Sequence, residues 1–281
     1  SLLLLILSSH SATAFNKGPI FIQNLGQWQD SVKFVCQSDS KMLWFTSGAV
    51  HHFMPSEIKE KTTFLKDTNS IFKRLSQDPE LVTEKFSIQY HIISTYFEGA
   101  SESPRIEVIE KRPEHFNFFI GSDATKWKSG VPSYSSIQYK DIYPGIDLTY
   151  YSRNRQIEYD FIIFPGADPS QIKIRYEGID SLFVEKNGDL HIVSELAEIE
   201  ESAPISYQLK DGKKQKIGTS FQMIAPDIVT FRLLDSIDHK YPLTIDPTLS
   251  YCTYFGTESY QTGRSISFDN AGNLLISGIT A

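Results

Sequence analysis

Short apolar or alternating segments follow one another along most of the chain, and turn residues separate them. In residues 171–176, Ile172, Ile174 and Tyr176 alternate with polar side chains, which predicts a strand with one buried face. Similar segments lie at 32–36, 42–45, 49–53, 84–94, 106–109, 116–120, 146–151, 156–164, 182–184, 190–193, 205–209, 219–223, 229–233 and 243–245. No amphipathic helix of more than about 12 residues interrupts them. The pattern predicts an all-β chain built as a sandwich or barrel, not βαβ units.

Three of these segments make more detailed predictions. Segments 146–151 and 156–164 are joined by four polar residues, which predicts a hairpin. Residues 84–94 alternate through Phe86, Ile88, Tyr90 and Ile92, as a half-buried strand does.

The N-terminal residues have the pattern of an export signal. Six consecutive apolar residues occupy positions 2–7, and Ala12, Thr13 and Ala14 follow as a small-residue cleavage pattern. This run is shorter than the ~20 residues of a membrane helix. We therefore expect residues 1–14 to be an N-terminally incomplete signal peptide, with a buried N-terminal strand as the alternative. The mature chain is then secreted or held at the cell surface, with no membrane-spanning segment.

Residues 55–82 are the least strand-like part of the chain. They are rich in charge, and we expect a variable surface insertion there, within a β-rich domain at 15–247. Its basic residues could bind an anion, although the Glu and Asp among them favour a solvated face.

The overall charge restricts the partners. The formal net charge is −7, so the chain gains nothing from neutralising phosphates, and nucleic acid is excluded as a partner. The two cysteines, Cys36 and Cys252, both lie in apolar contexts. Export permits a disulfide between them, but two separate buried thiols are the expectation.

A series of short motifs carries a family resemblance. They include Asn24-Leu25-Gly26-Gln27, Phe116–Gly121, Val131–Tyr134, Tyr143–Leu148, Glu158–Phe161, Pro165–Pro169, Asn187–Leu190 and Pro242–Pro247. The series resembles the uncharacterised bacterial domain that precedes SBBP-type β-propeller repeats, over roughly residues 20–247 and most weakly at 55–82. The resemblance implies a β-sandwich-like module followed by propeller repeats of the same chain.

Residues 248–281 resemble the start of the first SBBP repeat. Leu249–Gly256 is similar to its opening strand, and residues 265–280 to a strand, a turn and a strand. A propeller blade buries its faces only against neighbouring blades. We therefore expect a truncated β-propeller here, with further repeats beyond Ala281.

Several carboxylates are the candidates for chemistry. Asp147, Glu158 and Asp160 are the weak ligand-binding or catalytic candidates, since Glu158 and Asp160 share one face of a strand and lie across a short hairpin from Asp147. Asp141, Asp147 and Asp168 flank turns, where Asp caps backbone N–H groups, so a structural role is favoured. No metal site and no cofactor are predicted, with Ca²⁺ at the Asp-bearing turns as a weak alternative.

Other residues give weaker signals. His51 and His52 point to opposite faces of a strand, so the pair cannot bind one ion. The sequence contains no G-x-S-x-G nucleophile motif, and no Ser/His/Asp set has local support. The acidic run 195–201 is interpreted as a solvated strand edge. Aromatic residues cluster at Trp127, Tyr134, Tyr139, Tyr143, Tyr150 and Tyr151. They favour core packing over a platform for sugars.

Three functions are compatible with these observations. The first is a non-catalytic structural or binding module that caps a propeller used in adhesion or in binding a surface polysaccharide or protein. The alternative is a polysaccharide hydrolase with its site at the junction between domain and propeller. A Ca²⁺-stabilised adhesion domain is the third.

Overall fold

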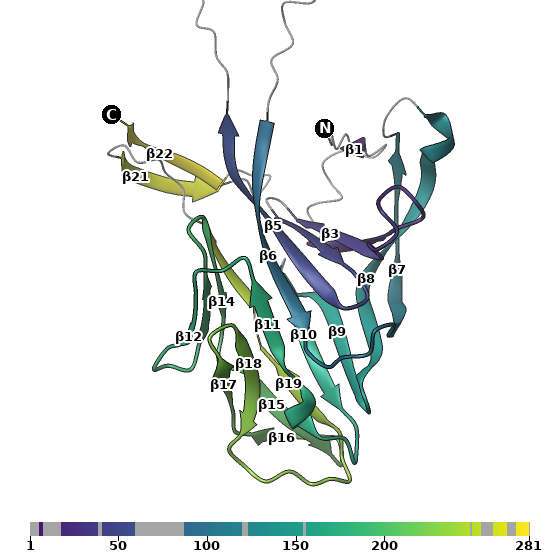
Figure 1. Cartoon of the computed structure of the whole chain (residues 1–281), viewed down its shortest axis with the longest axis vertical. Coiled ribbons are helices and arrows are strands. Elements are labelled where there is room, and N and C mark those ends of the chain that lie inside the picture. Colours follow the sequence, from purple (N-terminus) through teal and green to yellow (C-terminus); the bar gives the residue numbers. More distant parts are fainter. Residues whose placement is uncertain are drawn as a thin grey trace, which may run out of the picture.

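The computed structural model describes residues 6–7, 18–38, 41–59, 87–119, 123–153, 156–247, 249–253, 261–268 and 274–280. Within these ranges the chain is almost entirely strand (Figure 1). Helical structure in them is confined to two short 3₁₀ turns, η3 (Ala124–Lys126) and η4 (Pro169–Gln171). The all-β prediction is confirmed. None of the helices in these ranges has the length and apolarity needed to cross a membrane.

Fourteen antiparallel strands form one nearly closed, barrel-like layer, which we call the main sheet. In spatial order they are β16 (Lys213–Ile217), β15 (Ile205–Lys210), β19 (Leu243–Asp246), β10 (Gln156–Ile163), β9 (Ile146–Arg153), β8 (Lys128–Tyr143), β2 (Ile20–Gln23), β3 (Phe34–Ser38), β4 (Lys41–Phe45), β5 (Ala49–Lys59), β6 (Ser87–Phe97), β11 (Ile174–Glu177), β18 (Ile228–Leu233) and β17 (Thr219–Ala225). Off this path, β7 (Arg105–Phe118) pairs with β8, and β1 (Ile6–Leu7) pairs with the end of β7.

The main sheet nearly closes because its two end strands are neighbours in sequence. Gly218 is the only residue between β16 and β17. Its N–H donates to Asp235 Oδ2 at 2.6 Å, and its carbonyl accepts from the Leu234 N–H at 2.8 Å. A Cβ at this position would lie 2.9 Å from Asp235 Oδ2 and 3.2 Å from the Leu234 Cβ, so a larger residue would have to displace the Asp235 side chain.

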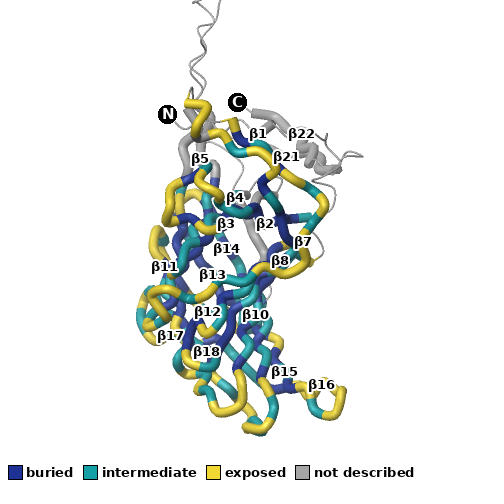
Figure 2. The backbone as a smooth tube through the Cα atoms, turned by 90° about the vertical axis from the view of Figure 1, so that its right-hand side faces the viewer, coloured by how far each residue is buried: buried dark blue, intermediate teal, exposed yellow. Residues whose placement is uncertain are grey.

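Opposite walls of the main sheet meet across one apolar core. Phe161 on β10 contacts Phe97 on β6 at 6.2 Å between ring centroids and Phe231 on β18 at 5.8 Å. The inward positions of β10 alternate with outward ones, so Ile157, Tyr159, Phe161 and Ile163 are all buried. In Figure 2, buried and half-buried positions colour the tube near the β10 label.

A second sheet of four strands packs against this core, and we call it the small sheet. Its order is β12 (Ser181–Val184), β13 (Leu190–Val193), β14 (Ala197–Glu201) and β20 (Leu249–Thr253). Leu190, Ile192, Ala197 and Ile199 from β13 and β14 are buried in the same cluster as the core of the main sheet. The two sheets therefore share one core.

Several sequence predictions fall partly outside the described residues. Residues 55–59 of the predicted insertion extend β5, while 60–86 lie outside the description. Of the predicted signal peptide, only residues 6–7 are described. In the predicted repeat, β21 (Gln261–Phe268) and β22 (Leu274–Thr280) form an antiparallel pair. Cys36 is a buried free thiol, and the side chain of Cys252 is not described.

Candidate functional site

Asp147 is placed in a structural role. Its side chain is 1% exposed and forms an ion pair with Lys140 Nζ, while its Oδ1 accepts from the Asp141 backbone N–H at 2.8 Å. Asp141 has a φ of 49°, and the pairing of β8 with β9 shifts register between Tyr139 and Tyr143. The carboxylate therefore holds an irregular turn of the backbone, as Asp does at turns.

Glu158 and Asp160 share the outward face of β10, as the sequence predicts. The main sheet adds Asp246 from β19 on the same face, which we infer from the register that pairs Phe161 with Ile245. We call Glu158, Asp160 and Asp246 the carboxylate cluster. Arg153 Nη1 lies 3.2 Å from Glu158 Oε2 and 3.9 Å from Asp246 Oδ2.

The environment of the carboxylate cluster disfavours full ionisation. Burial and the nearby charge of Asp246 raise the pKa of Asp160 to about 6, although the Tyr151 hydroxyl donates to it at 2.9 Å. Burial also raises the pKa of Asp246. Since like charges repel in a partly desolvated site, Asp160 holds its proton up to a pH of about 6, well above the ordinary range of an aspartate. A carboxyl of this kind can act as a general acid, or can serve as a structural hydrogen-bonding group.

The described part of the chain contains no group of three or more His, Cys, Asp or Glu side chains arranged to hold a metal ion. The cations near the carboxylate cluster are the guanidinium of Arg153 and the ammonium of Lys214, and both act on Asp246. The weak Ca²⁺ prediction therefore has no ligand set among these residues.

A third buried carboxylate, Glu201, was missed at the sequence level. The acidic run at 195–201 was predicted to be a solvated edge, but β14 is an interior strand between β13 and β20. Ala197, Ile199 and Glu201 alternate inward, and Glu201 is only 3% exposed. The solvated-edge interpretation is wrong for Glu201, because the period of a strand places every second residue of the run in the core.

Two tyrosines from the main sheet hold the Glu201 carboxylate. Tyr159 on β10 donates to Oε2 at 2.6 Å, and Tyr176 on β11 donates to Oε1 at 2.9 Å. Burial raises the pKa of Glu201 to about 7, although both hydrogen bonds lower it. We call these three residues the Glu201 clamp. The sequence signal that could have found it is the alternation Ala-Glu-Ile-Glu-Glu, in which the third inward position is acidic.

The histidines behave as the strand period predicts. His51 faces outward and its Nδ1 lies 2.8 Å from Ser94 Oγ, while His52 faces the core and its Nε2 lies 3.3 Å from Thr95 Oγ1. Burial lowers the pKa of His51. Ser94 lies opposite both His51 and Glu177, so the serine occupies the middle of this row of three side chains. A catalytic triad needs the histidine in the middle, and this row does not supply one.

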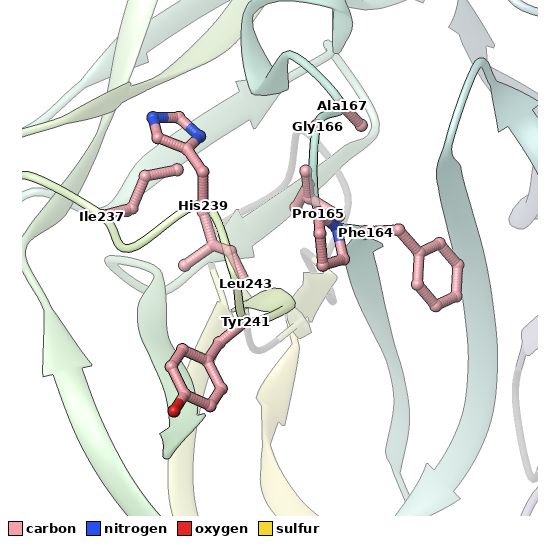
Figure 3. A pocket seen from close by; sticks show the side chains of 9 residues that line it. Phe164, Pro165, Gly166, Ala167, Ile237, His239, Tyr241 and Leu243 are labelled. Carbon is pink, nitrogen blue, oxygen red and sulfur yellow. The ribbon is translucent and has the colours of Figure 1, made fainter.

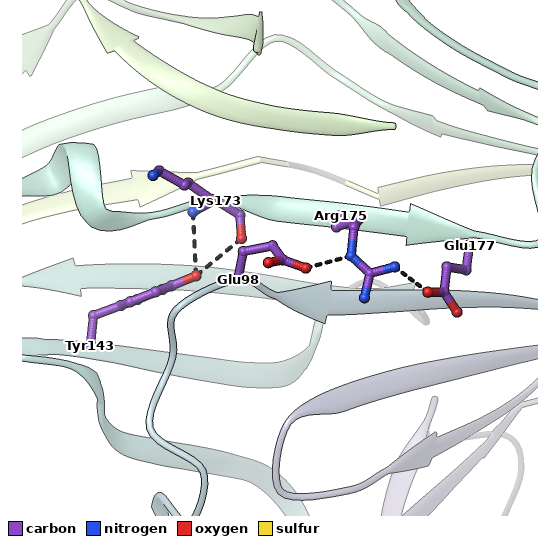
Figure 4. Close-up of polar contacts among 5 residues, drawn as sticks. All are labelled: Glu98, Tyr143, Lys173, Arg175 and Glu177. Atoms are coloured by element: carbon purple, nitrogen blue, oxygen red, sulfur yellow. Dashed lines mark hydrogen bonds and ion pairs between the residues drawn. The ribbon is translucent and has the colours of Figure 1, made fainter. Parts of the chain in front are cut away.

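An ion-pair network covers the neighbouring surface of β11 (Figure 4). Arg175 binds the carboxylates of Glu98 and Glu177, and its guanidinium lies 4.5 Å from the centroid of the Tyr96 ring. Beside it, the Tyr143 hydroxyl donates to the Lys173 carbonyl at 3.1 Å. The Arg175 guanidinium and both carboxylates thus have hydrogen-bonding partners within the network, which fits a structural role for it.

One small hollow lies at the end of β10 (Figure 3). It is lined by Ile163, Phe164, Pro165, Gly166, Ala167, Ile237, His239, Tyr241 and Leu243. Its volume of about 10 Å³ is enough for roughly one water molecule. A substrate does not fit in this hollow, and the carboxylate cluster does not line it.

The clustered aromatic residues divide between the core and the surface. Tyr134, Tyr139, Tyr143 and Tyr150 are buried, which confirms core packing for them. Trp127 is 42% exposed and contacts the ring of Phe119, itself 46% exposed, at 5.3 Å.

Comparison with known proteins gives one result. The family model described as a domain of unknown function, DUF7948, matches residues 21–248. The chain belongs to this family. Searches of curated proteins and of solved structures found no match. The DUF7948 domain thus contains all of the main sheet except the outermost residue of β2, together with the first three strands of the small sheet. It ends one residue before β20.

Proposed function

We propose that the DUF7948 domain is a non-catalytic scaffold that caps the structure following it, in a secreted or cell-surface bacterial protein. The observation that carries this proposal is the pairing of β20 with β14. β20 lies beyond the family match, yet five of its residues pair in register with β14, from Ala197 opposite Thr253 to Glu201 opposite Leu249. The domain supplies the edge on which the next segment starts.

The pairing of β20 with β14 covers a strand edge of the next part of the chain. An uncovered strand edge presents unpaired N–H and C=O groups and invites aggregation. By family resemblance, the structure after the domain is a β-propeller of SBBP repeats, whose first blade has an exposed side. A cap of this kind serves a protein that binds polymer, cells or matrix at the surface.

Two neighbouring proline variants test the cap in the full chain. Successive backbone N–H groups of a strand point to opposite sides, so only one of Ser250→Pro and Tyr251→Pro removes a hydrogen bond to β14. We expect that variant to abolish the deuterium-exchange protection of residues 249–253. Its partner variant, with the proline on the outer side, is the matched control and retains protection. Residues 249–253 that exchange freely in the unaltered chain would refute the cap.

A polysaccharide hydrolase is the second candidate function, and the carboxylate cluster is the observation that favours it. A glycosidase needs one carboxyl of raised pKa and a second carboxylate roughly 5–10 Å away. Asp160 has the raised pKa, and Glu158 shares its face. The ion pair of Glu158 with Arg153 and the Tyr151 hydrogen bond give both residues structural partners instead.

Release of reducing ends from a panel of bacterial and plant polysaccharides distinguishes the two functions. We expect the protein to bind a polymer without releasing reducing ends from it. Release that disappears in both Asp160→Asn and Glu158→Gln, with neither variant destabilised, would replace the scaffold proposal with the hydrolase.

A further inference from the structure

The Glu201 clamp joins three separate parts of the fold. Glu201 belongs to the small sheet, Tyr159 to β10 and Tyr176 to β11. In the main sheet, β10 and β11 are far apart along the path of strands, yet their walls face each other across the core. The clamp therefore fixes the small sheet to two opposite walls of the main sheet at once.

The clamp also lies at the start of β20. Glu201 is opposite Leu249 on one side and opposite Leu190 of β13 on the other. A movement of Glu201 out of its site would displace the end of β14 to which the first residue of β20 is paired. The pairing of β20 with the domain and the protonation state of Glu201 are thus coupled through β14.

We propose that loss of the Glu201 proton loosens the docking of the small sheet, so that the domain holds β20 more firmly at acidic than at alkaline pH. This inference rests on the proposed capping function. It makes the Glu201 clamp a pH-sensitive joint between the domain and the segment that begins with β20.

The physical basis is the cost of a charge in the core. Within the described residues, the groups that face Glu201 and interact with it electrostatically are the neutral phenols of Tyr159 and Tyr176, and no cation among them offsets an ionised carboxylate. Tyr150 on β9 packs behind Tyr159, at 5.5 Å between ring centroids. Undocking allows water to solvate the charge, so ionisation favours the undocked state.

One other group on the small sheet titrates in the same range. His191 lies on the outward face of β13, and its Nδ1 is 2.5 Å from Glu198 Oε1. Burial lowers its pKa, but Glu198 and the nearby Glu185 and Glu200 outweigh this effect and raise the pKa overall. Its protonated form also stabilises the small sheet at low pH, so the test must separate the two groups.

Deuterium exchange of residues 249–253 in the full chain, corrected for intrinsic exchange, tests the joint between pH 5.5 and 8.5. A carboxyl with a docked pKa of about 7 and an ordinary value of 4.5 predicts a rise in the opening constant of about 30-fold over this range. Glu201→Gln should lose most of this rise, because the amide keeps the shape and titrates no proton. Glu195→Gln, in the same acidic run but exposed, is the matched control and should retain it.

The outcomes separate the two proposals. Protected residues 249–253 with an opening constant that does not change with pH, or a Glu201→Gln variant with the full rise, would overturn the joint and leave the cap intact. Residues 249–253 that are unprotected at every pH would refute the cap itself. If Glu201→Gln does not fold, Tyr176→Phe serves in its place, and removal of that donor should make the rise steeper.

Discussion

Removal of one phenol hydroxyl from the Glu201 clamp should destabilise the protein by an amount that depends on pH. In Tyr159→Phe the ring stays in place, but Glu201 Oε2 loses the donor that lies 2.6 Å away. The Tyr139 hydroxyl donates at 2.8 Å to the carbonyl of Thr46, an acceptor that does not titrate. Tyr139→Phe is therefore the matched control for a buried tyrosine with a neutral partner.

The magnitude follows from the charge of the acceptor. At pH 5 Glu201 is protonated, and loss of a neutral hydrogen bond costs about 1 kcal/mol. At pH 8 it is ionised, and loss of a bond to a charged group costs about 2–3 kcal/mol. Because burial raises the folded pKa of Glu201 to about 7, above its ordinary value of 4.5, this group favours folding below pH 4.5. The contribution of Glu201 to the free energy of unfolding declines as the pH rises to about 7 and is constant above that pH. In Tyr159→Phe this decline should continue to higher pH.

Urea unfolding at pH 5 and pH 8, followed by circular dichroism, measures the free energy of unfolding of each variant. We expect Tyr159→Phe to lose about 1–2 kcal/mol more at pH 8 than at pH 5, and Tyr139→Phe to lose the same amount at both. An equal loss for Tyr159→Phe at the two pH values would refute the clamp, because the carboxylate would then have another source of solvation.

Three further outcomes are expected. A Cβ on Gly178, where φ is +77°, would lie 2.2 Å from the carbonyl oxygen of Ile92, whereas Gly99 has a similar φ of +73° and open space. In urea unfolding, Gly178→Ala should therefore cost about 1–3 kcal/mol more than Gly99→Ala, and an equal cost would contradict the described contact. Asp160→Asn should stabilise the fold by about 1–2 kcal/mol at pH 8 and by less at pH 5, since the folded pKa of Asp160 is raised from 3.8 to about 6, so that its ionisation weakens folding progressively between these pH values and by a constant amount above them; a loss of stability at pH 8 would show that the charge is needed. Burial raises the pKa of the Cys36 thiol, so iodoacetamide should label it only after unfolding, and rapid labelling of the native protein would place it at the surface.

Alternation along one strand predicted the fold where the strand is regular. Ile172, Ile174 and Tyr176 are predicted to share a buried face, and each is at most 2% exposed, although β11 itself begins at Ile174 and Ile172 is the C-cap of η4. The hairpin of β9 and β10 also forms where the polar residues between 151 and 156 predicted it. In both cases the pattern is local, and neighbouring residues are enough to set it.

Alternation failed to mark the inward face at the end of β6. Ile92 belongs to the apolar series that the sequence offers, yet it is 42% exposed, while the adjacent Ile93 is fully buried. The pairing of β5 with β6 shifts register between Pro55 and Glu57, opposite Tyr90 and Gln89. The extra residue lies in β5, so the bulge exchanges the faces of β5 while the alternation of β6 continues unbroken. Which side of β6 faces the core is set by its packing against other strands, and the pattern within β6 alone does not announce it.

In the candidate site, too, a local pattern in the sequence predicted some features and not others. The shared face of Glu158 and Asp160 follows from their spacing along β10. The addition of Asp246 and the Glu201 clamp depend on strands that are far away in sequence, so a local pattern could not reveal them. The structural alternative for Asp147 also follows from a local pattern, because Asp beside a turn has nearby N–H groups to accept from, and its Oδ1 accepts from the Asp141 N–H.

The pKa values of Asp160, Asp246 and Glu201 are all raised, and these shifts alone do not decide the function. Perturbed pKa values mark catalytic sites, but structural networks perturb them as well, so access to a substrate has to decide. Glu201 is 3% exposed, and both of its oxygens are bonded to tyrosines, so no substrate can reach it. Asp160 is more accessible, yet Tyr151 donates to it and Arg153 pairs with the other two carboxylates of the cluster, so each of the three has a structural partner. Glu201 is buried in the core, yet it still titrates. Since no substrate reaches it, its titration can affect only the packing around it. The chemistry of the described residues therefore favours a module whose titrations adjust how firmly it holds its neighbour.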